Sequence, residues 1–183
     1  MENNLYFLRH CKTINNIEKR ITGQQNISIL RGGEIETNQI SQCSNMTILS
    51  SPLIRCRETV DLFVNNLGGV SEINFCEELI ERNMGIFEGM LRENAVQEFP
   101  QYFIQNSFIY TMTPPSGESY AHIYHRANNF VKELLQHKLE KSNVLVCSHN
   151  HILKIIYCII LQIPIEEYWY TISFGEGKVN KII

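Results

Sequence analysis

Two histidines, His10 and His149, each follow a short apolar run of the kind that forms a buried strand, Leu5–Leu8 and 144–147, with one residue between the run and the histidine. The carboxyl ends of parallel strands meet at one edge of a sheet, where open α/β sheets bind their ligands. Arg9 stands beside the first histidine, and a guanidinium holds phosphate through paired charge-assisted hydrogen bonds. The pattern therefore predicts that both imidazoles share one sheet edge and act there on an anionic substrate, most simply a phosphate.

Three further residues suit phosphoryl transfer at this edge. Arg55 lies in the opening turn of a predicted helix after a strand, so its guanidinium can join Arg9. A helix N-terminus adds partial positive charge there. Neutral His10 would attack the phosphorus in line, while cationic groups and a donor on His149 stabilise the equatorial oxygens. Glu81 is the candidate acid that protonates the leaving oxygen.

The elements that must position these residues alternate along the chain. Strands are predicted at Leu5–Leu8, 47–49, 73–75 and 144–146, with a final pair at 170–173 and 178–182. Helices are predicted from Gly33 to about Cys43, from a Ser51 cap with Pro52 in its first turn to Gly68-Gly69, over about five turns from Ile123 onward, and over Ile152–Ile163. The polar stretch 11–29 and the glutamate-rich stretch 77–88 are predicted loops. This alternation predicts an α/β fold, a three-layer sandwich with a mainly parallel central sheet and helices on both faces.

Length and composition limit the alternatives. The chain has 183 residues, which suits a single domain, and a net charge of −3 from 16 basic and 19 acidic residues. It has no basic run suited to nucleic acid or to an anionic membrane, so neither is an expected partner. We expect a cytoplasmic protein because the first residues lack the features of a secretory signal. The six cysteines lack zinc-site spacing and are expected to be reduced.

The motifs occur in an order that resembles the histidine phosphatase superfamily, in its phosphoglycerate-mutase-like branch. The opening motif of that family reads RHGxT with Asn three residues later, and here it is Arg9-His10-Cys11-Lys12-Thr13 with Asn16. Further matching blocks are 20–23, Gly33, 50–55, 78–82 with Gly85 and Glu88-Gly89, 116–119 and 146–149. They span nearly the whole chain, and the short stretch between Glu81 and Gly117 resembles the compact phosphatases.

The resemblance implies a phosphoglycerate-mutase-like fold over residues 1–183 with a small cap segment around 82–115. It implies that His10 is phosphorylated, that Arg9, Arg55 and His149 form the phosphate pocket, and that Glu81 is the acid and base. It implies substrate contacts at Thr13, Asn16, Gly23, Arg82 and Asn150. No metal and no organic cofactor is implied. The expected partner is a small-molecule phosphate ester, and a homodimer is allowed.

Several positions depart from the family pattern. Cys11 replaces a glycine, so a side chain stands where the backbone normally approaches phosphate. Asn150-His151 replaces two glycines. Lys12 stands where the family more often has Glu, which favours a second anionic group on the substrate, and Asn26 stands where Asp is commoner.

Other interpretations of single residues remain open at this point. The acid role of Glu81 can be exchanged with Glu77, Glu78 or Glu88. The turn 116–119 is either a helix cap or a wall of the site. The aromatic residues between Phe99 and Tyr110 either cover the site or form core.

Rival chemistries fit the sequence less well. Cys76 and Arg82 have the spacing of a cysteine-dependent phosphatase loop, but the glutamates between them would repel a dianion. The pairs His149/His151 and His122/His125 could bind metal, yet the sole Asp, Asp61, lies in a predicted helix, and no cluster of carboxylates accompanies the pairs. His122 and His125 are expected on the solvated side of their own helix. No P-loop motif is present.

The sequence thus predicts a metal-independent phosphatase that hydrolyses a small-molecule phosphate monoester through a phosphohistidine on His10. Two alternatives remain. A phosphoglycerate-mutase-type phosphomutase would return the phosphoryl group to substrate, and a catalytically silent module would bind a phosphorylated ligand without turnover.

Overall fold

The computed structural model describes residues 3–37, 40, 45–67 and 70–183. Its main sheet has five strands in the order β3-β2-β6-β1-β7. The strands are β1 (Leu5–Arg9), β2 (Met46–Ser50), β3 (Val70–Phe75), β6 (Asn143–Ser148) and β7 (Val179–Lys181). All neighbours are parallel except β7, which runs antiparallel to β1. The predicted mainly parallel sheet is confirmed.

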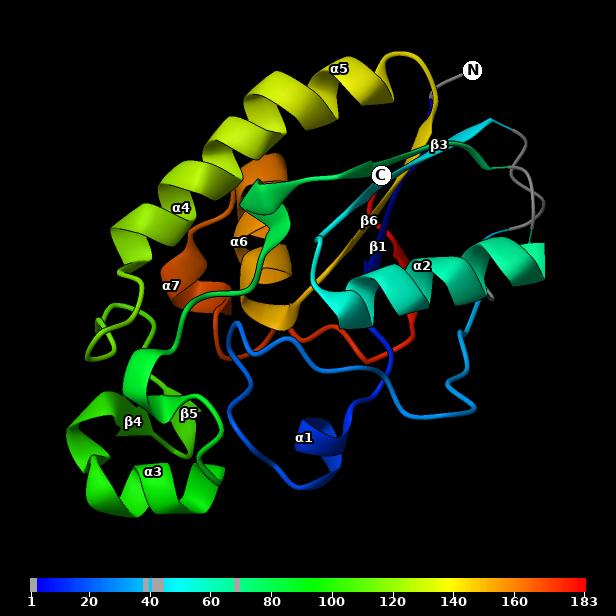
Figure 1. Cartoon of the computed structure of the whole chain (residues 1–183). Coiled ribbons are helices and arrows are strands. Elements are labelled where there is room, and N and C mark those ends of the chain that lie inside the picture. The colour runs from blue at the N-terminus through cyan, green and yellow to red at the C-terminus, as the bar shows by residue number, and fades with distance from the viewer. Residues whose placement is uncertain (1–2, 38–39, 41–44, 68–69) are drawn as a thin grey trace.

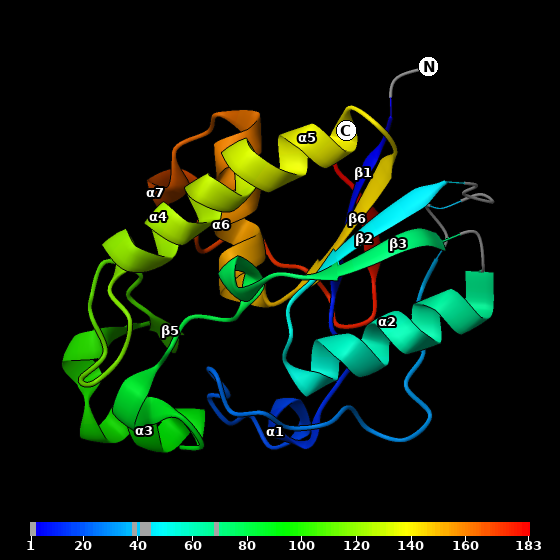
Figure 2. The ribbon, with the colours of Figure 1, turned by 45° about the horizontal axis from the view of Figure 1, so that its top comes forward.

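Helices cover both faces of this sheet (Figures 1 and 2). One face carries α2 (Ile54–Leu67). The other carries α4 (Tyr120–Asn129), a π-helical segment (Phe130–Leu135), α5 (Gln136–Leu139) and α6 (Asn150–Leu161). The fold is therefore the predicted three-layer α/β sandwich. Among the described residues, no helix is long and apolar enough to cross a membrane.

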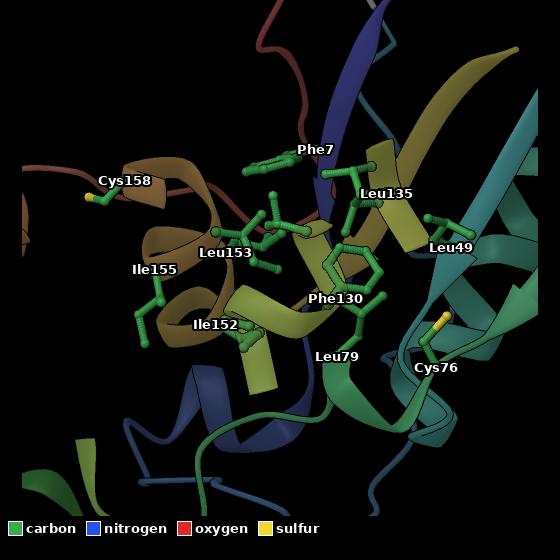
Figure 3. Packing of buried hydrophobic residues seen from close by; sticks show 14 of the residues in the cluster. Phe7, Leu49, Cys76, Leu79, Phe130, Leu135, Ile152, Leu153, Ile155 and Cys158 are labelled. Carbon is green, nitrogen blue, oxygen red and sulfur yellow. The ribbon is translucent and has the colours of Figure 1, made fainter. Parts of the chain in front are cut away.

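The alternation of side chains along β1 explains why both faces need a helical layer. Leu5 and Phe7 pack into a core cluster with α6, while Tyr6 and Leu8 pack into a second cluster with α2. Successive residues of a strand point to opposite faces, so a strand that is apolar at every position must be covered twice. Figure 3 shows the first cluster, in which Leu153 of α6 lies near Phe7.

Between β3 and α4 the chain leaves the sheet and forms a small lobe, residues 84–112. It contains the 3-10 turns Gly85–Phe87 and Pro100–Tyr102, the helix α3 (Arg92–Glu98), and a hairpin of β4 (Phe103–Ile104) and β5 (Ser107–Phe108). Phe87 lies at its centre, with four aromatic rings at centroid distances of 5.4, 5.3, 5.6 and 5.8 Å. The aromatic residues from Phe99 to Phe108 are thus core of the lobe, whereas Tyr110 packs on Trp169 and Tyr120.

The helix predicted from Gly33 to about Cys43 is wrong where the structure describes it. Residues 33–37 and 40 are not helical, and 38–39 and 41–44 lie outside the described residues. Glu36 instead receives a hydrogen bond from the Val179 N–H and donates one to the Gly177 carbonyl. This tertiary pairing with β7 satisfies backbone groups that a helix would have used.

The strand predicted at 170–173 is also wrong. The carbonyl of Tyr168, the last residue of the short helix α7 (Ile165–Tyr168), accepts from the N–H groups of both Thr171 and Ile172, which closes a turn. Two boundaries also differ from expectation. Helix α2 begins at Ile54, with Ser51 accepting from Leu53, and α6 begins at Asn150. The glycines 68–69 expected to end α2 lie outside the described residues.

Candidate active site

The pairing of β1 with β6 brings the two histidines together. Arg9 lies opposite Ser148 in the parallel register, and the next N–H, that of His10, donates to the Ser148 carbonyl at 3.0 Å. Both strands then end at the same edge of the sheet, and the ring centroids of His10 and His149 lie 5.2 Å apart. The juxtaposition expected from the two strand ends is confirmed.

His10 is held as a neutral imidazole, and among the described residues only its Nδ1 has a hydrogen-bond partner. Its Nδ1 lies 2.8 Å from the Cys11 carbonyl oxygen. A carbonyl only accepts, so Nδ1 carries the proton and Nε2 keeps its lone pair. Burial lowers the pKa of His10 well below its ordinary value, and the positive charges of Arg55 and Arg9 lower it further. A neutral ring with a bare Nε2 is the form that can act as a nucleophile.

His149 is buried and has a protein partner at each ring nitrogen. Arg55 donates from Nε to Nδ1 at 3.1 Å, so Nδ1 is unprotonated and Nε2 carries the hydrogen. The Ser51 hydroxyl lies 2.9 Å from Nε2, and the thiol sulfur of Cys56 lies 3.5 Å from it. Burial, followed by the charge of Arg55, lowers the pKa of His149 well below its ordinary value.

The buried guanidinium of Arg55 is also fixed by the loop that precedes β2. It donates to the carbonyls of Gln25, at 2.6 Å, and Gly23, at 2.8 Å. Gly23 has a φ of +51°, and a Cβ there would lie 2.1 Å from Oε1 of Glu88. That oxygen accepts from the Gln24 N–H at 2.9 Å. A side chain there would displace the carboxyl end of Glu88 and would be strained at this positive φ, so glycine is the residue that lets this carbonyl reach Arg55 without strain.

Arg9 forms an ion pair with a carboxylate, that of Glu176, which no sequence motif indicated. One of its terminal nitrogens donates to the Phe174 carbonyl at 3.0 Å, and the other lies 2.8 Å from Oε1 of Glu176. The Nε atom of Arg9 is buried and has no hydrogen-bond partner among the described residues. Burial lowers the pKa of Arg9, and the charge of Glu176 opposes that shift. The only sequence signal for Glu176 was its position between two glycines in a turn.

Thr13 and Asn16 form the short turn beside Arg9, the helix α1 (Ile14–Ile17). The side-chain oxygen of Asn16 accepts from both the backbone and the hydroxyl of Thr13, at 2.9 and 2.8 Å. The amide nitrogen of Asn16 reaches Glu176 at 3.4 Å. Cys11 stands before this turn with its thiol directed to the Glu34 carbonyl, 3.6 Å away.

Glu81 is the carboxylate of the glutamate-rich stretch that reaches the site. It accepts from the N–H of Arg82 at 2.9 Å and from the N–H of His151 at 3.2 Å. Burial lowers the pKa of Arg55, and the nearby charge of Glu81 acts against that shift. Glu77 and Glu78 are exposed. Glu88 accepts hydrogen bonds from the backbone N–H groups of Gln24 and Met84.

Asn150 and Arg82 have different surroundings. Asn150 is the first residue of α6, directly after the N-cap His149, and its side-chain oxygen accepts from the Phe174 N–H at 3.4 Å. It therefore lies beside the histidine pair. The buried guanidinium of Arg82 donates instead to three backbone carbonyls, those of Tyr110, Met112 and Glu118. The structure does not place the Arg82 guanidinium beside the histidine pair. Through these three bonds Arg82 instead links the lobe to the segment that precedes α4.

Other sequence-level alternatives are resolved by local contacts. Ser119 caps α4, accepting from the His122 N–H at 3.2 Å, while Glu118 pairs with Arg126. His122 and His125 are exposed as expected. Within the described ranges, no group of three His, Cys, Asp or Glu side chains is placed to hold a metal ion. The five described cysteines are buried free thiols, and Cys43 lies outside the described residues.

The assembled geometry suits an anion at His10. Arg9, Arg55 and the N-terminus of the twelve-residue helix α6 supply positive potential around the ring. Glu81 stands at the margin of this group, where it can exchange a proton. A phosphoryl group in contact with Nε2 of His10 would therefore lie in this region of positive potential.

Comparisons with known proteins point in one direction. The family model described as histidine phosphatase superfamily (branch 1) matches residues 5–182. Fructose-2,6-bisphosphatase of Saccharomyces cerevisiae is 28% identical over 176 residues, which cover 92% of this chain but only 36% of that protein. The chain thus spans about a third of this relative.

Two further similar proteins are matched over most of their own length. The 2,3-bisphosphoglycerate-dependent phosphoglycerate mutase of Cytophaga hutchinsonii is 25% identical over 169 residues, 89% of this chain and 79% of the mutase. The solved structure of a mycobacterial glucosyl-3-phosphoglycerate phosphatase in complex with VO3 superimposes with a TM-score of 0.75. It covers 98% of this chain and 92% of the phosphatase at 20% identity, a likeness of fold.

Proposed function

The chain belongs to branch 1 of the histidine phosphatase superfamily, and from that premise we propose that it hydrolyses a small-molecule phosphate monoester through a phosphohistidine on His10. The observation that carries the proposal is the state of His10, whose Nδ1 is bound to the Cys11 carbonyl. Its Nε2 is thereby a bare nucleophile beside two arginines and a helix N-terminus.

In the first step Nε2 of His10 attacks phosphorus, and the bond to the ester oxygen breaks. Glu81, in its protonated form, gives its proton to that oxygen, so the alcohol leaves neutral. Arg9 and Arg55 stabilise the charge on the equatorial oxygens. In the second step a water attacks the phosphohistidine, Glu81 takes the proton of that water, and inorganic phosphate leaves. Both steps balance without a metal or an organic cofactor.

His149 is the residue whose role depends most on rearrangement. Its Nδ1 orients Arg55 and its Nε2–H lies against Ser51. An equatorial oxygen of the bound phosphoryl group would compete with the Ser51 hydroxyl for that N–H. Donation from His149 to the phosphoryl group, as the resemblance implies, therefore requires this one hydrogen bond to be exchanged.

A phosphomutase is the second candidate, because a phosphoglycerate mutase is among the similar proteins. It would share the first step and return the phosphoryl group to a hydroxyl of the product. The silent module would need the arginines but neither the nucleophile nor Glu81. The presence of both groups, placed as described, favours catalysis over binding alone.

The test is release of p-nitrophenol from p-nitrophenyl phosphate in the presence of EDTA, for the wild type and His10→Ala. We expect turnover to persist in EDTA and to fall by at least about 10³-fold in His10→Ala, because a nucleophile that acts in a unit cannot be replaced by its neighbours. His122→Ala, at an exposed histidine, is the matched control and should retain full activity.

A rapid-quench experiment then separates the candidates. Acid-labile phosphate on His10 that is lost to water at the rate of turnover supports a phosphatase. A stable phosphohistidine that is discharged only by added 3-phosphoglycerate supports a mutase. Undiminished activity in His10→Ala would overturn the assigned nucleophile, and saturable phosphate binding with no turnover would favour the silent module.

A further inference from the structure

The backbone directly after His10 is held by a side chain of α2. The N–H of Cys11 donates to Oγ1 of Thr59 at 2.9 Å, across a sequence separation of 48 residues. Thr59 is fully buried and Cys11 is 1% exposed. A buried N–H without a partner costs the free energy of its lost hydration, so the Thr59 hydroxyl is what allows the Cys11 backbone to stay in this place.

The partners of the Thr59 hydroxyl fix the direction of both hydrogen bonds. Its Oγ1 also lies 2.6 Å from the carbonyl oxygen of Arg55, one helical turn earlier. A carbonyl only accepts and a backbone N–H only donates, so the hydroxyl donates to Arg55 and accepts from Cys11. A side chain without a hydroxyl at this position can make neither bond.

Cys11 also carries the carbonyl that sets the tautomer of His10. That oxygen lies 2.8 Å from Nδ1 of His10, and it belongs to the residue whose N–H is bound to Thr59. Only the two rotatable backbone bonds of Cys11 separate its N–H from its carbonyl group. A displacement of Cys11 would therefore disturb the hydrogen bond that keeps the proton on Nδ1 and the lone pair on Nε2.

The same turn of α2 is bonded to both histidine segments. Arg55 and Thr59 are four residues apart and lie on one side of the helix. Arg55 donates from Nε to Nδ1 of His149, while Thr59 holds the chain that follows His10. Through these two side chains α2 fixes the nucleophile and the buried guanidinium relative to each other.

We propose that Thr59 is a positioning residue for phosphoryl transfer, which acts through the Cys11 backbone to keep His10 protonated at Nδ1 and to aim its Nε2. The Thr59 hydroxyl itself has no need to touch the substrate. In-line attack depends on the direction of the Nε2 lone pair, so a small misalignment slows the chemical step more than it weakens binding. This inference rests on the proposed function and adds a residue to its mechanism.

The kinetic test compares Thr59→Val, which removes the hydroxyl, with Thr59→Ser, which keeps it. With p-nitrophenyl phosphate we expect kcat to fall about 10- to 100-fold in Thr59→Val, the scale of a buried hydrogen bond left unmade beside a misaligned nucleophile. KM should stay within about 3-fold, because no contact with the phosphoryl group is removed. Thr59→Ser should restore kcat to within about 3-fold of the wild type, because serine offers the same donor and acceptor.

The matched control is Thr47→Val, which also removes a buried hydroxyl. Oγ1 of Thr47 lies 2.8 Å from Oγ of Ser142, near the start of β2 and away from the end that leads to Ser51. Thr47→Val should lower the free energy of unfolding but keep kcat. An equal fall of kcat in both valine variants would overturn the positioning role, as would an unchanged kcat in Thr59→Val or a Thr59→Ser variant that fails to restore activity.

A second measurement reports on the His10 ring and needs no turnover. Histidine labelled with a nitrogen isotope in its ring allows NMR to identify the protonated nitrogen, and the signals missing from His10→Ala are those of His10. In the wild type the proton should be on Nδ1. In Thr59→Val the chemical shifts of the two nitrogens should approach each other as the second tautomer becomes populated. In Thr47→Val they should stay as in the wild type.

The two measurements separate this inference from the proposed function. If the wild type hydrolyses no phosphate ester but Thr59→Val changes the tautomer of His10, the proposed function fails and the hold of Thr59 on His10 is supported. If the wild type is active and Thr59→Val keeps both kcat and the tautomer, only the inference fails. Should Thr59→Val not fold, because a methyl group replaces an oxygen 2.6 Å from the Arg55 carbonyl, Thr59→Ala removes the hydroxyl without that clash and is judged by the same outcomes.

Discussion

Arg9, one of the two cations proposed to hold the phosphoryl group, already holds a carboxylate. Its ion pair with Glu176 spans 2.8 Å, and the two side chains are 16% and 22% exposed. At such partial burial a carboxylate next to a dianionic phosphate repels it by more than it would in bulk water. Glu176 should therefore weaken the binding of substrate and of inorganic phosphate alike.

Glu176→Gln tests this at the level of one atom. The amide keeps a hydrogen-bond acceptor for Arg9 but removes the negative charge. We expect KM for p-nitrophenyl phosphate and the inhibition constant of inorganic phosphate both to fall by about 3- to 10-fold, the scale of one partly screened charge pair. Steady-state kinetics at pH 7 measure both. Glu72→Gln, in an exposed ion pair with Lys138, should change neither. A rise in KM would mean that Glu176 positions Arg9 instead.

Residue types and spacing were enough to place the centre of the site. His10 and His149 follow paired strands, so the sheet brings them together whatever their side chains do. Residue types and spacing do not determine the direction in which a side chain points. Arg82 and Glu81 are neighbours in the sequence, yet the guanidinium of Arg82 donates to carbonyls of the lobe, whereas the carboxylate of Glu81 accepts from the N–H of His151 at the start of α6. Glu176 was missed because its place depends on where a turn meets Arg9.

Among the elements, the turn at Gly85 decides how the lobe joins the rest. Gly85 has a φ of +54°, and a Cβ there would lie 2.0 Å from the carbonyl oxygen of Pro115. That same carbonyl accepts from the Ile86 N–H at 3.1 Å. The turn Gly85–Phe87 and the segment that precedes α4 are thus in contact at a point with no room for a side chain.

Gly85→Ala should therefore destabilise the protein by more than the backbone strain alone. Gly32→Ala is the control, since Gly32 has a φ of +75° but a Cβ there would meet nothing within 4 Å. We expect a loss of about 1 kcal/mol in the free energy of unfolding for Gly32→Ala and at least about 2 kcal/mol more for Gly85→Ala. Urea denaturation gives both values. Equal losses would show that the turn moves away without cost.

Periodicity predicted the elements that lie within the layers and failed at the margins. The strands β1, β2 and β6 and the helices α2 and α6 have apolar patterns that the sheet enforces. The helix predicted over 33–43, incorrect where the structure describes it (33–37 and 40), and the incorrect strand at 170–173 lie in connections. In these connections Glu36 bonds to Gly177 and Val179, and Tyr168 closes a turn. Such contacts join distant segments or close tight turns, and the local spacing of apolar residues does not predict them.

For the molecule as a whole, the buried histidines should make the folded state less stable at low pH. Burial lowers the pKa values of His10 and His149 well below 6.5 and that of His151 to about 4. Below pH 6.5 the unfolded chain binds protons that the folded chain refuses, so the free energy of unfolding falls as the pH drops. Each histidine contributes up to about 1.4 kcal/mol per pH unit in that window.

Urea denaturation at pH 7.5, 6.5, 5.5 and 4.5 measures this slope. His151→Gln should reduce it by about one proton between pH 6.5 and 4. The double variant His122→Gln/His125→Gln changes two exposed imidazoles and should leave the slope as in the wild type. Constant stability from pH 7.5 to 5.5 would contradict neutral burial of these rings.

The place of β1 in the sheet also sets an order of events during synthesis. β1 lies between β6 and β7, and its approach is fixed by contacts such as that between Asn4 and Asn143, 139 residues apart. The ribosome therefore releases the nucleophile-bearing strand long before either neighbour exists. At the usual rate of translation this interval lasts on the order of ten seconds. During it an apolar strand stays without the two strands that flank it in the folded sheet, and the histidine pair cannot form until β6 has emerged.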